Sequence, residues 1–180
     1  MNIQIQRTKR QSLGLMITRE GEVLIKAPKN ASEKYILDFV QSKSIWIQKK
    51  LSQISQSREL VKSLNLENLD ILKQKKFAKI LIITKVKHWS EKMQLEFKNV
   101  RLSSARMHWG SCTQNNTISI NWRLSLLPAE LLEYVIIHEL AHIKEKNHSA
   151  KFWDIVHRNS PNFKELKKKL KTFNSILQLV

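Results

Sequence analysis

Residues 135–153 read VIIHELAHIKEKNHSAKFW, and the HExxH pattern within this stretch guides the interpretation of the whole chain. His138 and His142 are four residues apart, so on a helix their imidazoles lie on one face, about 5 to 6 Å apart, and can reach one metal ion. Glu139 directly follows the first histidine and can take a proton from a water molecule at that ion. We therefore predict a zinc-dependent hydrolase in which Glu139 is a base and not a ligand.

A third ligand is available at His148, six residues after His142. The chain must turn between them, because a continuing helix would carry His148 away from the metal. Metzincin proteases have the same interval, but Glu145 stands where those enzymes have a glycine, and no methionine follows the motif. Asn147 is the residue here that best tolerates a left-handed turn. We predict a metal site of His138, His142 and His148. A turn that differs from the metzincin turn is expected to bring His148 to the other two histidines.

The expected cofactor is one Zn²⁺ ion per chain, because catalytic zinc sites with three protein ligands keep the fourth position for water. Such an ion lowers the pKa of that water toward about 7 and polarises the group under attack. Manganese, cobalt and nickel are alternatives, since imidazole binds each of them and cellular supply decides among them. A peptide carbonyl and a phosphoryl group can both be attacked in this way, so the metal site alone does not identify the substrate.

The length and composition are those of one globular domain. The chain has 180 residues, 42% of them hydrophobic, and only three glycines and three prolines, so we expect a single domain over residues 1–180. The start of the chain lacks the apolar run of a secretory signal, and no run approaches the roughly 20 residues of a spanning helix. The single cysteine, Cys112, cannot form an internal disulfide. We therefore expect a cytoplasmic protein with no membrane partner.

The charge balance is strongly basic, with 32 Lys and Arg against 15 Asp and Glu and a formal net charge of +17. Such a field attracts nucleic acid and nucleotides, although the solvated faces of lysine-rich helices explain it equally well. A second functional class is therefore a basic nucleic-acid-binding module with structural zinc. A structural zinc site usually closes with a fourth protein ligand, and none is evident beside the three histidines.

Apolar periodicity predicts an α+β fold in which a small antiparallel sheet packs with helices. Alternation in the first thirty residues indicates an antiparallel meander with a turn at Gly21. After these first thirty residues, a long amphipathic helix is expected to extend to about Ser57, because apolar residues recur at helical spacing. Residues 58–70 are expected to form a connector, followed by a second helix from about Leu69 to Leu95.

The second half of the chain contains the predicted active-site elements. Residues 100–104 and 117–121 are expected to be strands of a hairpin around the turn-rich stretch GSCTQNN. Pro128 suits the first turn of a helix that continues through the HExxH pattern. Further helices are expected to begin near Ser149 and near Ser160.

Two longer stretches carry a family resemblance, MHWGSCTQNNTISINWRLSLLP at residues 107–128 and EYVIIHELAHIKEKNHSAKFW at residues 133–153. They include the elements WGSC, NWRL, HELAH and NHS and a Phe-Trp pair, and they resemble the YgjP-like metallopeptidase domain family, most strongly over residues 100–165. The resemblance implies a zincin-like fold related to SprT-type and minimal-gluzincin proteases, with the hairpin from WGSC to NWRL beside the catalytic cleft.

The resemblance also implies roles for individual residues. His138, His142 and His148 match the metal ligands of the family, and Glu139 matches its catalytic glutamate. Some members are described as UTP pyrophosphatases, so the fold name does not fix the substrate. Hydrolysis of a peptide bond is the leading prediction, and pyrophosphate cleavage of a nucleoside triphosphate at the same site is the alternative.

Other polar and aromatic residues near the motifs could belong to the site or have a structural role. Arg106 and Arg123 lie near the ends of the predicted hairpin strands, where a guanidinium could bind a substrate phosphate or carboxylate, or simply form surface salt bridges. The tryptophans near the motifs are expected in the core, as their large apolar surface suggests: Trp109, Trp122 and Trp153. Cys112 is expected to be structural, and no role is assigned to His108 or His157.

The carboxy-terminal lysines alternate with leucines. We interpret Lys167, Lys168, Lys169 and Lys171 as the solvated face of an amphipathic helix. Contact of this face with nucleic acid is the functional alternative.

Overall fold

The computed structural model describes residues 3–18, 20–64, 66 and 68–179. Its mixture of strands and helices confirms the predicted α+β class. The chain divides into two compact units, here called the amino-terminal unit, which ends at Ser63, and the carboxy-terminal unit, which begins at Leu64. The expectation of one domain over residues 1–180 stays a prediction.

The amino-terminal unit contains a three-stranded sheet of β1 (Ile3–Thr8), β2 (Gly14–Ile17) and β3 (Val23–Pro28) in the order β1-β3-β2. The predicted antiparallel meander is wrong for β1, which pairs with β3 in parallel, whereas β2 and β3 are antiparallel. Alternation indicates which face of a strand is buried but not which strands pair. The central place goes to the strand with the most buried face, through Val23, Ile25 and Ala27.

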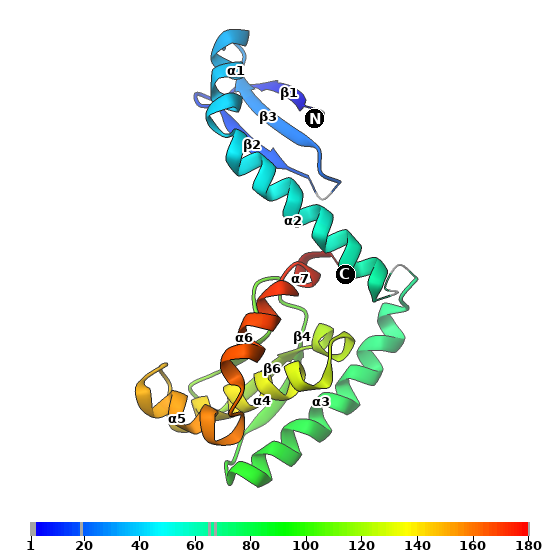
Figure 1. The fold of residues 1–180 in the computed structure, drawn as a ribbon, viewed down its shortest axis with the longest axis vertical. Helices are drawn as coiled ribbons and strands as arrows, with labels where there is room; N and C mark the ends of the chain where they lie inside the picture. Colours follow the sequence, from blue (N-terminus) through cyan, green and yellow to red (C-terminus); the bar gives the residue numbers. More distant parts are fainter. Residues whose placement is uncertain (1–2, 19, 65, 67, 180) are drawn as a thin grey trace. The chain divides into compact units, whose positions relative to one another are not determined.

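Two helices follow this sheet, α1 (Glu33–Ser42) and α2 (Ser44–Ser63), and α1 and the first turns of α2 pack against it (Figure 1). The sequence predicted one helix to about Ser57, but the helix breaks at Lys43 and then continues into the expected connector at 58–70. Residues 65 and 67 of that connector lie outside the described residues. The break leaves no mark in the apolar pattern, because the buried Val40 and Ile47 are separated by two helical turns with or without it.

The carboxy-terminal unit begins with α3 (Ile71–Met93), which confirms the helix predicted over 69–95. Its first turn is capped by Asp70, whose carboxylate accepts hydrogen bonds from the backbone N–H groups of Leu72 and Lys73. Its last turn ends at Gln94 in the left-handed conformation. One face of α3 is buried in the unit through Ala78, Ile82, Val86 and Trp89.

A second sheet consists of β4 (Asn99–Ser103), β5 (Gly110–Cys112) and β6 (Thr117–Asn121) in the order β4-β6-β5. The predicted hairpin between the first and last of these strands is wrong, because β4 runs parallel to β6. The hairpin instead joins β5 and β6, which are antiparallel, through a turn in which Asn116 has a φ of 56°. A strand of three residues is too short to show the alternation of apolar and polar residues. The sequence of β5 therefore could not be distinguished from the turn-rich stretch around it.

A short 3₁₀ helix, η1 (Trp122–Leu126), leads into α4 (Ala129–Lys144), and α5 (Ala150–Asn159), α6 (Phe163–Thr172) and α7 (Ile176–Leu179) follow. The helices predicted from Pro128 and from Ser149 are confirmed, and the last predicted one begins at Phe163, slightly later than expected. α4 lies inside the unit and packs against α3, β5, α5 and α6 (Figure 1). No helix in the described part of the chain has the length and apolar character needed to cross a membrane.

Candidate metal site

Two of the three candidate histidines lie on α4, the central helix of the carboxy-terminal unit. The helix is apolar almost all round, and its buried side chains include Leu131, Val135, Ile136 and Leu140. It is therefore fixed by packing rather than by local propensity. His138 and His142 lie one helical turn apart on the side that faces α5, and their ring centroids are 5.1 Å apart.

The loop after α4 brings His148 back toward this face. α4 ends at Lys144, and the next residue, Glu145, adopts an extended conformation while its backbone N–H still bonds to the carbonyl oxygen of Ala141. The expected left-handed turn at Asn147 is wrong, since Gln94 and Asn116 are the only non-glycine residues with positive φ in the described part of the chain. Asn147 instead accepts a hydrogen bond from the N–H of Ser149 at its side-chain oxygen, at 3.1 Å. An Asx turn therefore redirects the chain here without a glycine.

The three imidazoles converge on one point. One ring nitrogen from each of His138, His142 and His148 lies within 4.8 Å of the others. The Nε2 atoms of His138 and His148 are 3.1 Å apart, close to the roughly 3.3 Å between two nitrogens bound tetrahedrally to zinc at 2.0 to 2.1 Å. His142 Nδ1 lies 2.9 Å from the carbonyl oxygen of Glu145, which leaves its Nε2 available. This donor set fits a zinc-sized ion.

Aromatic rings from α5 hold the imidazoles in place. Phe152 is fully buried, and the ring of His142 stacks on it with centroids 4.4 Å apart and planes 30° apart. His148 stacks on Trp153 with centroids 5.6 Å apart and planes 24° apart. Because Ser149 caps α5 by accepting from the N–H of Phe152, the helix that supplies these rings starts directly after His148. The ligand geometry is thus supported by packing from the protein itself.

Burial keeps two of the imidazoles neutral. It lowers the pKa of His138 to about 3, with smaller contributions from His142, His148 and Lys167. Burial is also the main reason that the pKa of His142 is lowered. A neutral imidazole has the free lone pair that a metal requires. These two side chains are therefore ready to bind a cation at neutral pH without first losing a proton.

Glu139 is buried beside the histidines, with 6% of its surface exposed. Burial raises the pKa of its carboxyl group to about 8. The neighbouring strand β5 comes so close that a Cβ atom on Gly110 would lie 2.7 Å from Oε1 of Glu139. A buried carboxylate without a compensating charge is costly, and a divalent cation at the three histidines would supply that charge.

Raising the pH should destabilise the metal-free protein relative to its Glu139→Gln variant. In the folded chain Glu139 has a pKa of about 8, compared with an ordinary value of 4.5 in the unfolded chain. Between these values the folded state binds more protons, so the free energy of unfolding falls as pH rises, by at most about 1.4 kcal/mol per pH unit. Glutamine does not titrate, so the variant lacks this slope.

Urea unfolding of chelator-treated protein at several pH values from about 4.5 to about 8 measures this difference. Glu96→Gln is the matched control, since it makes the same substitution at an exposed carboxylate. A stability difference between wild type and Glu139→Gln that does not change with pH would show that the Glu139 carboxyl group titrates normally.

Lys146 ties the loop that carries His148 to the β5–β6 turn. Its ammonium group donates to the carbonyl oxygen of Thr113 at 3.1 Å and to Oδ1 of Asn116 at 2.7 Å. Cys112 Sγ lies 3.9 Å from the same nitrogen, and burial is the main cause that raises the pKa of its thiol. A thiol with a raised pKa is a poor nucleophile, which agrees with the structural role predicted for Cys112.

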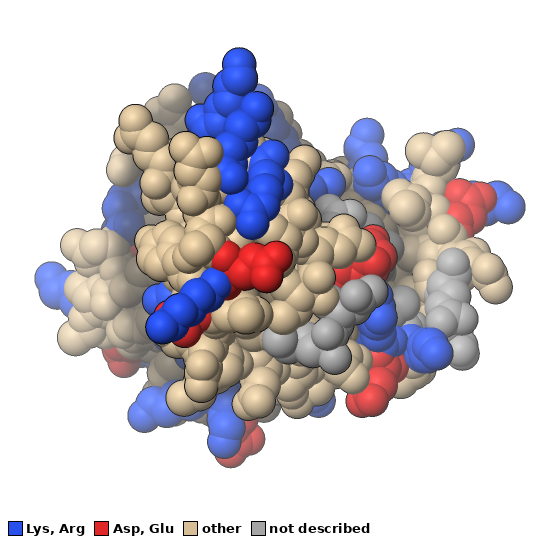
Figure 2. Space-filling model, turned by 90° about the horizontal axis from the view of Figure 1, so that it is seen from above, with Lys and Arg blue, Asp and Glu red and all other residues tan. Residues whose placement is uncertain are grey.

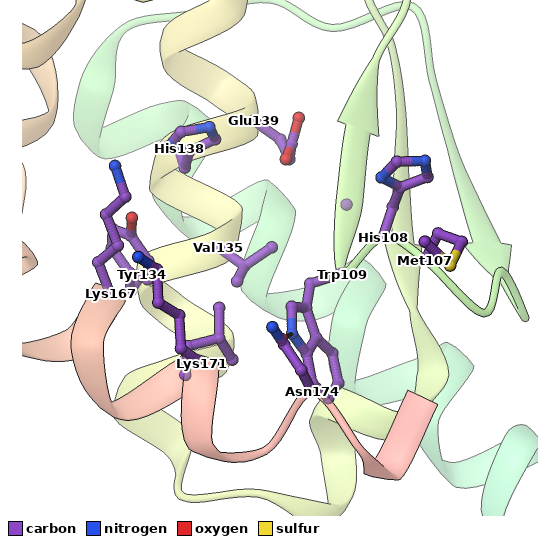
Figure 3. Close-up of a pocket in the computed structure, with 12 residues that line it drawn as sticks. Met107, His108, Trp109, Tyr134, Val135, His138, Glu139, Lys167, Lys171 and Asn174 are labelled. Atoms are coloured by element: carbon purple, nitrogen blue, oxygen red, sulfur yellow. Dashed lines mark hydrogen bonds between the residues drawn. The ribbon is translucent and has the colours of Figure 1, made fainter. Parts of the chain in front are cut away.

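A cavity of about 290 Å³ opens beside His138 and Glu139. α4, α6 and the chain around β5 form its walls (Figure 3). Sequence reasoning assigned no site role to several of its lining residues: His108, Trp109, Tyr134, Lys167, Lys171 and Asn174. Two helical spacings in the sequence could have indicated some of them, because Tyr134 precedes His138 by four residues and Lys171 follows Lys167 by four. The contribution of the loop before β5 had no such signal.

The two candidate substrate-binding arginines do not line this cavity. Arg123 is 6% exposed. Its guanidinium donates to Oδ1 of Asn121 at 3.4 Å and lies 4.9 Å from the ring of Trp122. Arg106 is exposed and close enough for its charge to contribute to the lowered pKa of Arg123, of which burial is the larger cause. The structure thus brings the two arginines near each other, and their contact with substrate stays a prediction.

The prediction that the three tryptophans lie in the core is confirmed for two of them. Trp122 is 1% exposed and Trp109 is also buried, although Trp109 in addition lines the cavity and donates from Nε1 to Oδ1 of Asn174 at 2.8 Å. Trp153 is only partly buried, although one of its faces lies against His148.

Comparison with known proteins gives a family match over most of the chain. The model of the YgjP-like metallopeptidase domain matches residues 11–76 and 66–173. Among solved structures, the metallopeptidase zymogen abylysin of Pyrococcus abyssi is similar, with 26% identity and a TM-score of 0.47 over 51% of this chain and 92% of that one. The metallopeptidase zymogen jannalysin of Methanocaldococcus jannaschii has 25% identity and a TM-score of 0.45 over 49% and 92%. A search of curated proteins gave no match.

Proposed function

The chain belongs to the YgjP-like metallopeptidase domain family, and on this premise we propose that it is a metal-dependent peptidase. One observation carries the proposal: three imidazole nitrogens converge within 4.8 Å, beside a carboxyl group that is buried without a compensating charge. His138, His142 and His148 would hold one divalent ion. Zinc is the expected ion, because its tetrahedral preference and its affinity for imidazole suit three ligands with a fourth position left open.

Glu139 is the proposed general base. A divalent ion at this site would act as a Lewis acid, lowering the pKa of the attacking water and polarising the peptide carbonyl. The carboxylate of Glu139 takes the proton from the attacking water and delivers it to the leaving nitrogen. The close approach of Gly110 leaves this carboxylate little room to move, which supports a fixed position for the base.

Strand β5 is the proposed binding edge for an extended peptide. In the sheet order β4-β6-β5 it pairs on one side only among the described residues, and it packs against α4. Backbone pairing along such an edge would align a peptide next to the histidines. Gly110 of this strand lies next to Glu139, the proposed base.

Hydrolysis of nucleotides and binding of nucleic acid are weaker candidates. The family match is to a metallopeptidase domain, and the two arginines that could bind a substrate phosphate or carboxylate do not line the cavity. The described residues bring three histidines together without a fourth protein ligand, which is the composition of a catalytic rather than a structural zinc site.

An activity panel tests the proposed function. Protein loaded with zinc, manganese or cobalt is incubated with an unfolded protein, with peptides, and with UTP and other nucleoside triphosphates. We expect peptide-bond cleavage that stops when the ion is removed by a chelator, and no release of pyrophosphate. A Glu139→Gln preparation purified in parallel controls for contaminating proteases. Pyrophosphate release that depends on Glu139, without peptide cleavage, would reject the peptidase in favour of the nucleotide hydrolase.

A further inference from the structure

The wall of the cavity formed by α6 carries two lysines that the proposed chemistry does not use. We propose that Lys167 and Lys171 bind a carboxylate of the substrate and so direct the peptidase toward peptides with an acidic group next to the bond that is cut. This inference rests on the proposed function, because it names the substrate class of the same site.

Both lysines form part of the cavity wall. Lys167 and Lys171 are four residues apart on α6, so they lie on one face of that helix, and both line the cavity that begins at His138 and Glu139 (Figure 3). The Nζ of Lys167 lies 4.5 Å from the centre of the Trp153 ring. That ring stacks in turn on His148. Lys167 is thus linked through one aromatic ring to the metal site.

The charges around the cavity are unbalanced. Among the described residues, neither Lys167 nor Lys171 is part of an ion pair, whereas Lys169 on the same helix pairs with Glu130 at 2.6 Å. Of the described residues that line the cavity, Glu139 is the only acidic one, and a divalent ion at the histidines would offset its charge. On the face drawn in Figure 2, acidic side chains lie among the basic ones. The cavity therefore has a net positive charge that can attract an anionic group of the substrate.

The size of the cavity favours a carboxylate over a nucleotide. A volume of about 290 Å³ is at the lower end of the range for small-molecule sites, which suits a single side chain or a chain terminus. In a peptide substrate the anionic groups are the side chains of Asp and Glu and the terminal carboxylate. Both sources offer the same chemistry to two ammonium groups, and the experiment separates them.

Binding is measured with the zinc-loaded Glu139→Gln variant, which should hold peptide without cutting it. Three labelled peptides with amidated ends differ only in one residue beside the scissile bond, which is Glu, Gln or Lys, and a fourth has Gln with a free carboxyl terminus. We expect the Glu peptide to bind about tenfold more tightly than the Lys peptide, and we expect this preference to shrink at high salt. Stronger binding of the fourth peptide than of the Glu peptide would identify the terminal carboxylate as the preferred group.

Substitutions on α6 assign the preference to the two lysines. Each of Lys167→Gln and Lys171→Gln should weaken binding of the Glu peptide by about two- to fivefold, and the double Lys→Glu variant should reverse the preference. Lys168→Gln and Lys168→Glu are the matched controls, because Lys168 is exposed on the same helix and does not line the cavity. Circular dichroism and metal content show that each variant is folded.

The outcomes separate this inference from the proposed function. Equal binding of all four peptides overturns it, and so does an equal effect of substituting Lys168, which would reflect the general positive charge of the protein. Tighter binding of UTP than of the Glu peptide would overturn the carboxylate assignment. If the wild-type protein cuts all peptides at equal rates, the peptidase proposal stands and this one fails. A carboxylate preference in binding without any cleavage would support the specificity of the cavity while rejecting the peptidase.

Discussion

Replacing Glu139 with glutamine is expected to lower peptide hydrolysis by about 10²- to 10⁴-fold while the metal ion stays in place. Glutamine has nearly the same shape as glutamate, so it fits the space between α4 and Gly110. It has no basic lone pair for the proton of the attacking water. The loss should therefore be seen mainly in kcat, with little change in the affinity for peptide.

Steady-state rates and the metal content of the same preparation test this expectation. Glu96→Gln again serves as the matched control, because it changes an exposed carboxylate far along the chain from the motif. If Glu139→Gln retained near-normal turnover with a full complement of metal, the role of general base would have to be given to another group.

Removing any one of the three histidines should weaken metal binding by more than about a hundredfold, since even the outer partners of metal ligands typically contribute 10- to 100-fold. His138→Ala and His142→Ala each take one ligand from α4, and His148→Ala takes the one on the loop. Activity should fall together with metal occupancy. Zinc should also raise the thermal midpoint of the wild-type protein more than that of any of these variants, because an ion that binds only the folded state stabilises it.

Chelator competition gives the affinity, and elemental analysis gives the number of ions per chain. His157→Ala is the control, because His157 is exposed on α5 and lies outside the cluster of three histidines. Folded His138→Ala, His142→Ala and His148→Ala variants that all kept wild-type metal content would show that the ion binds elsewhere.

The helices of this chain were more predictable than the pairing of its strands. α4 could be predicted because its apolar residues, the proline before it and the histidine spacing all agree. The partners of β1 and β4 could not, because both strands pair in parallel across another segment of chain, and alternation does not encode the partner. The break at Lys43 could not be predicted either, because the apolar residues keep their helical spacing on both sides of it.

The candidate metal site was more visible in the sequence than the cavity beside it. His138, His142 and His148 stand at spacings dictated by coordination chemistry, and the structure brings all three together. The sequence pattern of Lys167 and Lys171 predicts a solvated helix face, because a lysine on an amphipathic helix has the same pattern whether it faces bulk water or a cavity. Only the packing of α6 beside α4 separates these two cases.

The contact between Gly110 and Glu139 restricts which substitutions position 110 can accept in evolution. All other amino acids carry a Cβ atom, and at position 110 that atom would lie 2.7 Å from the Glu139 carboxylate. A mutation of the glycine codon therefore acts on the glutamate side chain, although the two positions are 29 residues apart in the sequence. Position 110 can therefore change freely only where the glutamate is no longer needed, whereas loss of the glutamate leaves a glycine at position 110 undisturbed.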